Sequence, residues 1–202
     1  MKKSENLQIQ HLHTLQLQNF MSDGGIPSRF YDTKLDEFGV LGQAFKNVIL
    51  SPTYFVDMNN LFLYGGVHGA AIGFSIIRAM RIIHSDDSAH CISLAGLIAM
   101  QDYMAGRSSV TLYRGLTEAF LETVYSLNKT LFIHDFVSNL GIDQPYTSRE
   151  RYIIEDYIRS RFDEGLVTIV YSPFPLDQLE GVWSKRFLMD MESQMTIQIV
   201  NQ

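Results

Sequence analysis

The sequence is poor in cysteine, proline and positive charge. Cys91 is its single cysteine, so an internal disulfide is excluded, and the apolar residues around Cys91 predict a buried thiol in a reducing compartment. Lysine and arginine number 16 against 22 aspartates and glutamates, which gives a net charge of -6, and there is no basic stripe. This balance argues against broad electrostatic attachment to nucleic acid and leaves a local DNA contact open. The cytoplasm is the expected location, because the thiol of Cys91 predicts a reducing compartment.

Long hydrophobic runs are also scarce. The start of the chain turns polar and glutamine-rich without the apolar run that a secretory signal needs. One stretch, residues 58–77, has no charged residue and is long enough to span a bilayer. It contains four glycines, two asparagines and a histidine, however, and a buried strand followed by a helix accounts for its apolar content. We therefore expect no membrane segment.

The remaining composition is that of one folded domain. Hydrophobic residues make up 46% of the 202 residues and aromatic residues 12%, which is enough for a sizeable core. Residues 1–24 are predicted to be an N-terminal appendage, in which the apolar residues fit neither helix nor strand spacing throughout. The run Gly24-Gly25-Ile26-Pro27 predicts a break in regular secondary structure, so the main domain is expected to span residues 25–202.

Segments with strand and helix patterns alternate along this domain. Such alternation predicts an α/β fold with a mainly parallel sheet that helices cover on both faces. Thr147 to Glu150 fits a capping box that starts one helix, and Gly165 ends that helix. The predicted strands are 61–64, 89–94, 130–134, 166–171 and 195–200. The other predicted helices are 37–49, closed by Pro52, then 70–84, two within 95–127, and short turns near 176–180 and 184–190.

A glycine-rich turn joins the strand at 61–64 to the next helix, in the order of a Walker A phosphate-binding loop. A working loop has the pattern G-x-x-x-x-G-K-[ST], because the lysine reaches the phosphates and the hydroxyl holds Mg²⁺. Counted from Gly65, the last three places hold Ala70, Ala71 and Ile72. The layout of the loop is therefore present, whereas its charge and its hydroxyl are missing.

Two interpretations of this loop stay open. Backbone N–H groups of Gly65, Gly66 and Gly69, together with the helix N-terminus, would bind phosphate. Alternatively, the glycines only permit a tight turn and close packing. His68 could supply a proton or a weak positive charge, but without the lysine a Mg–nucleotide would lose its main charge partner.

A second motif follows the apolar strand at 130–134. P-loop ATPases place there an aspartate that holds Mg²⁺ through water and a glutamate that positions the attacking water. Asp135 keeps the first place, and Phe136 stands in the second, where it cannot orient water. Asp135 fits equally well as a cap at the end of the strand.

His134 and Asp135 also allow a small metal-dependent phosphohydrolase as a less favoured alternative. The further ligands would be histidines upstream or aspartates downstream, namely His84, His90, Asp156 and Asp163. Neighbouring residues of a strand face opposite ways, however, which argues against convergence of His134 and Asp135 on one metal. We therefore expect no metal site.

A third motif lies after the strand at 166–171, where an ATPase places a polar residue that senses the γ-phosphate. Ser172 could take that role, whereas Pro173 offers no donor. Two cations, Lys185 and Arg186, follow at a predicted helix. Arg186 is the candidate for an arginine finger toward a neighbouring subunit, and the alternative is a solvated basic pair.

The order of these parts resembles the DnaC/IstB group of AAA+ ATPases, which are helicase loaders and transposition helpers, with DnaA- and Hda-type proteins next. The resemblance covers roughly residues 26–200 and depends on sequence order, since each motif alone is weak. Its segments are Ile26 to Phe38, Leu63 to Gly66 at Walker A, Leu131 to Asp135 at Walker B, residues 165–179 at sensor 1, and Lys185 to Met191 around the finger. It implies a three-layer P-loop NTPase core of the AAA+ type with a five-stranded sheet. Because the chain ends soon after the last predicted strand, we expect no separate helical lid.

The departures from this family are systematic. The Walker A lysine and hydroxyl, the Walker B glutamate and the sensor asparagine are all missing. We therefore expect a catalytically inactive relative with no catalytic residue and no cofactor. It would act by contacts with a replication or transposition protein, such as a helicase, an initiator or a loader.

The alternative is a weakly nucleotide-binding helicase loader or a DnaA-related regulator. In that case Gly65, Gly66, Gly69 and Asp135 would form a vestigial site for ATP or ADP with Mg²⁺. Arg186 would complete this site from a neighbouring subunit of a homo-oligomer. The sequence leaves both the oligomeric state and the identity of the partner open.

Overall fold

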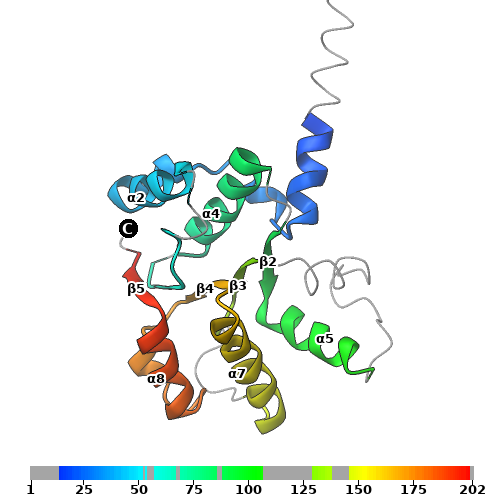
Figure 1. Cartoon of the computed structure of the whole chain (residues 1–202), viewed down its shortest axis with the longest axis vertical. Coiled ribbons are helices and arrows are strands. Elements are labelled where there is room, and N and C mark those ends of the chain that lie inside the picture. Colours follow the sequence, from blue (N-terminus) through cyan, green and yellow to red (C-terminus); the bar gives the residue numbers. More distant parts are fainter. Residues whose placement is uncertain are drawn as a thin grey trace, which may run out of the picture.

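The computed structural model describes residues 14–51, 53, 57–66, 69–85, 88–106, 129–137 and 146–200. These residues form an α/β fold around one five-stranded sheet with the order β2-β3-β4-β1-β5, in which every neighbouring pair is parallel (Figure 1). The predicted fold class is therefore confirmed. The strands are β1 Leu61–Tyr64, β2 Ala89–Ser93, β3 Thr130–His134, β4 Val167–Ser172 and β5 Thr196–Ile199.

The helices lie close to the predicted segments. The main helices are α2 Gly39–Leu50, α4 Gly69–His84, α5 Leu94–Met104, α7 Ser148–Asp163 and α8 Lys185–Gln194. Short 3₁₀ helices are η1 Ser28–Phe30, η2 Leu35–Phe38 and η3 Leu176–Leu179. Residues 14–23 are also helical. Pro52 and the second helix predicted within 95–127 lie outside the described residues.

Local contacts explain where the boundaries differ from the prediction. The strand predicted to reach residue 94 ends at Ser93, because the Ser93 hydroxyl accepts a hydrogen bond from the Gly96 N–H (3.0 Å) and caps α5. Helix α8 continues to Gln194 instead of 190, since Met191 in its last turn is buried in the core. The predicted capping box of Thr147 and Glu150 is present at the start of α7.

The sheet separates two layers of helices. In Figure 1, α2 and α4 lie on one side of the sheet, and α5, α7 and α8 lie on the other. Strand β1 shows the resulting alternation, because Leu61 and Leu63 pack toward α2 and α4 whereas Phe62 packs toward α7 and α8. Burial on both faces is what a parallel sheet requires, and it explains the continuous apolar strands in the sequence.

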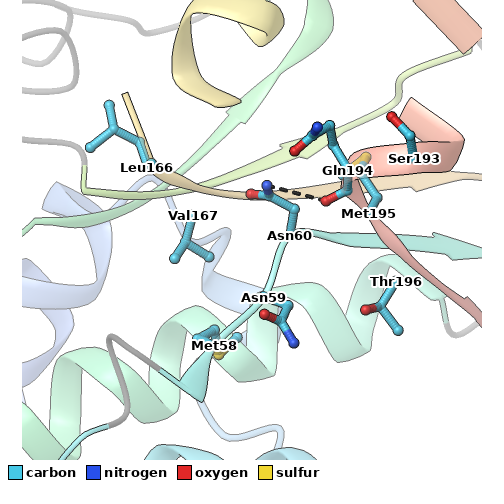
Figure 2. Close-up of a pocket in the computed structure, with 10 residues that line it drawn as sticks. Met58, Asn59, Asn60, Leu166, Val167, Ser193, Gln194, Met195 and Thr196 are labelled. Atoms are coloured by element: carbon cyan, nitrogen blue, oxygen red, sulfur yellow. Dashed lines mark hydrogen bonds between the residues drawn. The ribbon is translucent and has the colours of Figure 1, made fainter. Parts of the chain in front are cut away.

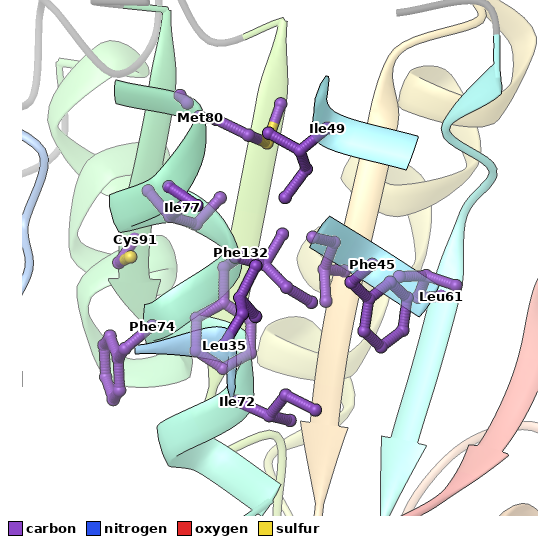
Figure 3. Packing of buried hydrophobic residues seen from close by; sticks show 14 of the residues in the cluster. Leu35, Phe45, Ile49, Leu61, Ile72, Phe74, Ile77, Met80, Cys91 and Phe132 are labelled. Carbon is purple, nitrogen blue, oxygen red and sulfur yellow. The ribbon is translucent and has the colours of Figure 1, made fainter. Parts of the chain in front are cut away.

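Helix α4 approaches the sheet unusually closely at Gly73. A Cβ atom at this position would lie 2.2 Å from the Cζ atom of Phe132, so the ring of Phe132 fills the space that a side chain would need. Phe74 meets the same ring edge to face, with ring centroids 5.1 Å apart. Figure 3 shows Phe74 and Phe132 in the core between α4 and the sheet.

Two buried arginines fasten helix ends to the starts of strands. On α7, Arg161 donates hydrogen bonds to the Val167 carbonyl (2.7 Å) and the Thr168 hydroxyl (3.0 Å). On α4, Arg81 donates to the carbonyls of Ala89 (2.9 Å) and Phe20 (2.7 Å). Arg81 therefore links the helix at residues 14–23 to the sheet. The predicted domain boundary at residue 25 itself stays a prediction.

The described part of the chain contains no helix that is long and apolar enough to cross a membrane.

Gly73→Ala is expected to lower the free energy of unfolding by about 1–3 kcal/mol, because the new methyl group would overlap the ring of Phe132. Helix propensity alone predicts the opposite sign, since alanine is favoured over glycine by ~1 kcal/mol. Urea unfolding followed by circular dichroism measures the change. The double variant Gly73→Ala/Phe132→Leu should lose less stability than the two single changes together. A more stable Gly73→Ala variant would contradict the packing argument.

Candidate functional site

The residues predicted for the nucleotide site lie at the carboxyl ends of the strands. Gly65 and Gly66 follow β1, Asp135 follows β3, and Gly69 begins α4. Strand β4 lies between β1 and β3, and the carboxyl ends of parallel strands share one edge. The structure therefore brings four of the predicted site residues to the end of the sheet where ligands bind in open α/β folds.

The glycines of the loop are required by its backbone. Gly65 and Gly66 have φ values of +82° and +56°, in the left-handed region that residues with a side chain rarely adopt. The turn from β1 to α4 therefore needs glycine whether or not a phosphate binds. His68 lies outside the described residues.

Tyr171 fills the space beside the start of α4. Its hydroxyl donates a hydrogen bond to the Gly66 carbonyl (3.1 Å), and a Cβ atom on Gly69 would lie 2.1 Å from the Cε2 atom of its ring. In a phosphate loop, backbone N–H groups at this helix start face the anion. Here an aromatic ring is packed against that point and hydrogen-bonded to the loop.

Tyr171 is a site residue that the sequence analysis missed. Its signal was the alternation of β4, which turns Val167, Ile169 and Tyr171 toward α4. An aromatic residue at the end of that series must reach the glycine turn that begins the facing helix. The pattern shows the side of the sheet, but only the packing shows the contact with Gly69.

The places of the missing Walker A residues differ in burial. Ile72, at the place of the hydroxyl residue, is completely buried, and Figure 3 shows it among the core side chains. Ala71, at the place of the lysine, is half-buried. Ile72 therefore serves the core, whereas a longer side chain at Ala71 would have access to the surface.

Asp135 ends β3 in a left-handed conformation with a φ of +57°, which aspartate tolerates better than most residues. Its carboxylate lies 2.9 Å from Nδ1 of His134, and its side chain is 54% exposed. The expectation that His134 and Asp135 face opposite ways was wrong, because the strand ends at His134 and its alternation stops there. The carboxylate is thus partly exposed at the carboxyl end of β3, where it contacts His134.

The negative charge of Asp135 acts on two tyrosines. Burial, together with Glu150 and Asp135, raises the pKa of Tyr146 to about 12. Burial and then Asp135 also raise the pKa of Tyr171. Asp135 therefore places a negative charge close to both phenol groups.

Phe136, in the place of the catalytic glutamate, is a core residue. It is completely buried and stacks on Trp183, with ring centroids 4.6 Å apart. Tyr146 also stacks on Trp183, at 5.2 Å, and Phe187 meets Trp183 edge to face at 5.8 Å. The position that orients water in an ATPase thus contributes to an aromatic cluster.

Ser172, the alternative to the sensor asparagine, is completely buried. Its hydroxyl accepts a hydrogen bond from the Phe174 N–H (3.0 Å). This bond satisfies a backbone donor in the turn after β4. Ser172 therefore stabilises this turn, and its burial keeps it from the open edge.

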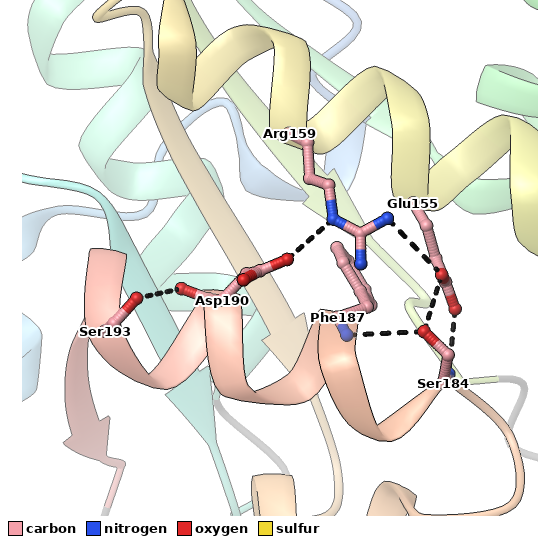
Figure 4. A network of polar contacts seen from close by, with 6 residues as sticks. All are labelled: Glu155, Arg159, Ser184, Phe187, Asp190 and Ser193. Carbon is pink, nitrogen blue, oxygen red and sulfur yellow. Dashed lines mark hydrogen bonds and ion pairs between the residues drawn. The ribbon is translucent and has the colours of Figure 1, made fainter.

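The candidate arginine finger, Arg186, lies in the first turn of α8. It is exposed and forms no ion pair with any residue that the structure describes. Glu155 fixes the start of this helix by accepting hydrogen bonds from the Ser184 N–H (2.8 Å) and hydroxyl (2.7 Å). Arg159 binds Asp190 further along α8, at 2.7 Å (Figure 4). Arg186 is therefore presented on a rigid helix.

The ligands of the alternative metal site are not assembled. The described residues contain no group of three or more histidine, cysteine or acidic side chains that could hold a metal ion. His84 instead contacts the Ile49 carbonyl, and His90 is buried within β2. The phosphohydrolase alternative thus gains no support from the described part of the chain.

A polar pocket lies at the amino ends of the strands, between the starts of β1, β4 and β5 (Figure 2). Its volume is about 450 Å³. Asn60 accepts a hydrogen bond from the Thr168 N–H (2.8 Å) and donates one to the Gln194 carbonyl (3.4 Å). These bonds hold the start of β1 against β4 and the end of α8, so Asn60 serves the sheet.

Comparisons of the sequence with protein families and with curated proteins give no match. Solved structures do match. The DnaC helicase loader has a TM-score of 0.62 and 15% identity over 87% of this chain and 100% of that one. DnaI has a TM-score of 0.57 and 12% identity over 87% of this chain and 92% of that one.

AMPPCP-bound DnaA from Aquifex aeolicus has a TM-score of 0.58 and 12% identity. The match covers 87% of this chain but only 51% of DnaA, so the chain spans about half of that protein. The predicted resemblance to DnaC-like proteins, with DnaA-type proteins next, is confirmed at the level of fold. The chain has the AAA+ fold of these helicase-loader and initiator structures.

Proposed function

We propose that this chain is a catalytically inactive protein with an AAA+ fold that acts through protein contacts in DNA replication or transposition. The observation that best supports the proposed inactivity is the packing of Tyr171 against Gly69 and its hydrogen bond to Gly66. The loop that would hold phosphates is bound to a side chain of its own domain. Its partner would be a helicase, an initiator or a loader.

The other positions that contact nucleotide in an ATPase support this proposal. Ala71 offers no charge to a phosphate, and Ile72 is committed to the core. Phe136 stacks in the aromatic cluster around Trp183 instead of orienting water. The groups that stabilise and position the reactants of phosphoryl transfer are therefore not assembled at this end of the sheet.

The assignment to replication rests on fold similarity. The matched structures include a helicase loader and a replication initiator, DnaA, and the latter structure contains AMPPCP and single-stranded DNA. A fold hosts different functions, so the partner must be tested directly. The net charge of -6 favours a protein partner over the DNA backbone.

A weak site for ATP or ADP with Mg²⁺ is the second candidate. Asp135 and Arg186 favour it, since the carboxylate is exposed at the correct edge and the guanidinium is exposed on α8. Tyr171 opposes it, because the ring occupies the space beside Gly69. The two candidates therefore differ in whether Tyr171 leaves the loop when nucleotide is present.

Isothermal titration of the protein with Mg–ATP and with Mg–ADP is expected to show no binding at nucleotide concentrations up to about 1 mM. The physical reason is that the loop lacks a lysine and already binds Tyr171. A dissociation constant in the micromolar range would refute the inactive-site proposal and favour the second candidate. A parallel titration with Mg²⁺ alone controls for binding to Asp135.

Restoring the charge and removing the ring is expected to restore nucleotide binding in steps. Ala71→Lys alone should bind Mg–ATP weakly or not at all, and Ala71→Lys/Tyr171→Asn should bind at least about tenfold more tightly. Ala71→Lys/Tyr171→Phe is the matched control, because it keeps the ring and removes only the hydroxyl. Equal binding by all three variants would show that Tyr171 does not obstruct the loop.

The partner proposal predicts a direct complex. Affinity capture from a lysate of the native cells should recover a helicase, initiator or loader, and the purified pair should bind in the absence of nucleotide. Tyr171→Asn should leave this complex unchanged if the loop has no role in it. Failure of every purified replication or transposition protein to bind would reject the proposal.

A further inference from the structure

The two outer strands of the sheet, β2 and β5, differ in what lies beside them. On the outer side of β2, the Cys91 N–H donates a hydrogen bond to the Gly24 carbonyl (2.7 Å), so the segment after the helix at 14–23 covers this edge. Strand β5 pairs with β1 on its inner side. Its outer side has no hydrogen-bonded partner among the residues that the structure describes. Within the described part of the chain, the edge of β5 is therefore the open one.

The hydrogen bonds to β1 show which backbone groups face outward. The Thr196 N–H donates to the Asn60 carbonyl (2.8 Å), and the Val200 N–H donates to the Tyr64 carbonyl (2.9 Å). Backbone groups of a strand alternate between its two sides. The N–H and C=O groups of Ile197 and Ile199 therefore point away from β1, toward the open side.

The side chains of this edge offer no protection against pairing. Ile197 is 41% exposed and Ile199 is 52% exposed, and residues 195–200 contain neither a charge nor a proline. Exposed edges are usually protected by lysine, proline or a bulge. An uncharged edge with β-branched residues is a template for another strand.

We propose that β5 pairs antiparallel with β5 of a second copy of this chain. In the register that centres on Gln198, Ile197 lies opposite Ile199 of the second copy, and the reverse pair follows by symmetry. These residues carry the outward N–H and C=O groups, so both pairs exchange two hydrogen bonds each. The two sheets then become one continuous sheet about a twofold axis.

The pattern of the strand favours a second copy over an unrelated segment. Directly opposed residues in an antiparallel pair lie on the same face, so this register places the four isoleucines together. A shift of two residues would put Ile199 opposite Met195 and break this match. Because the strand carries no charge, the twofold axis brings no like charges together. The interface is short, so we expect a weak, concentration-dependent dimer. It does not involve the loop at Gly65, and its test is independent of the proposed function.

Sedimentation equilibrium of the full chain between about 10 µM and 1 mM tests the dimer. The wild type should show a monomer–dimer equilibrium within this range. Ile197→Lys/Ile199→Lys should raise the dissociation constant at least about tenfold, because each ammonium group faces another. Ile197→Glu/Ile199→Lys should restore dimerisation, because the proposed register places opposite charges face to face.

Two further variants separate backbone pairing from general surface effects. Ile199→Pro removes an outward N–H while sparing the hydrogen bonds to β1, and it should weaken the dimer. Met189→Lys changes an exposed apolar residue that lies on α8 and not in the strand, and it should leave the dimer unchanged. Circular dichroism confirms that each variant is folded.

A wild type that stays monomeric throughout would overturn the proposal. So would a dimer that the two double variants weaken equally, since the register demands opposite effects. A monomer that instead binds an extended peptide from another protein along β5 would replace the second copy with a foreign strand. Loss of dimerisation in Met189→Lys would assign the interface to α8.

Discussion

The close approach of α4 to the sheet is the contact on which both the core and the site depend. Gly69 and Gly73 lie one turn apart on the face of α4 that meets β3 and β4, and the rings of Tyr171 and Phe132 occupy the space beside them. Helix and sheet cannot come this close with larger residues at these positions. Gly69, one of the glycines that suggest a phosphate loop, is therefore required for packing.

The same region of α4 contacts the loop that precedes it. An active P-loop holds its glycine turn open for phosphate, whereas here the Tyr171 hydroxyl binds the Gly66 carbonyl. After β3, Phe136 stacks on Trp183, with ring centroids 4.6 Å apart. Burial of large side chains stabilises a core, and Ile72 and Phe136, which stand at two of the compared positions, are both completely buried.

The polar contacts around α8 concern rigidity more than chemistry. Ser184 caps α8 by accepting a hydrogen bond from the Phe187 N–H (3.3 Å), and Glu155 holds Ser184 by accepting two hydrogen bonds from it. The helix leads directly into β5, whose start Asn60 holds through the Gln194 carbonyl. A fixed helix therefore leads into the outer strand of the sheet, whose end lies beside the start of the glycine loop, where the Val200 N–H donates a hydrogen bond to the Tyr64 carbonyl (2.9 Å).

Much of the fold was predictable because a parallel sheet leaves a strong mark on the sequence. Strands β1 and β3 were placed to the residue, since short apolar runs that end in glycine or aspartate are typical of buried parallel strands. The ends of α8 and β2 were less predictable, because buried Met191 and the Ser93 cap set them. The order of the motifs identified the fold, although each motif alone was weak.

The sequence by itself determined that the loop lacks a lysine and a hydroxyl and that Phe136 replaces a glutamate. Only the tertiary structure decided what occupies the space that these losses leave. Tyr171 and Trp183 are distant from the loop and from Phe136 in the chain, and their rings reach them only after the strands have paired. Packing between remote segments depends on three-dimensional distance, which local periodicity does not encode.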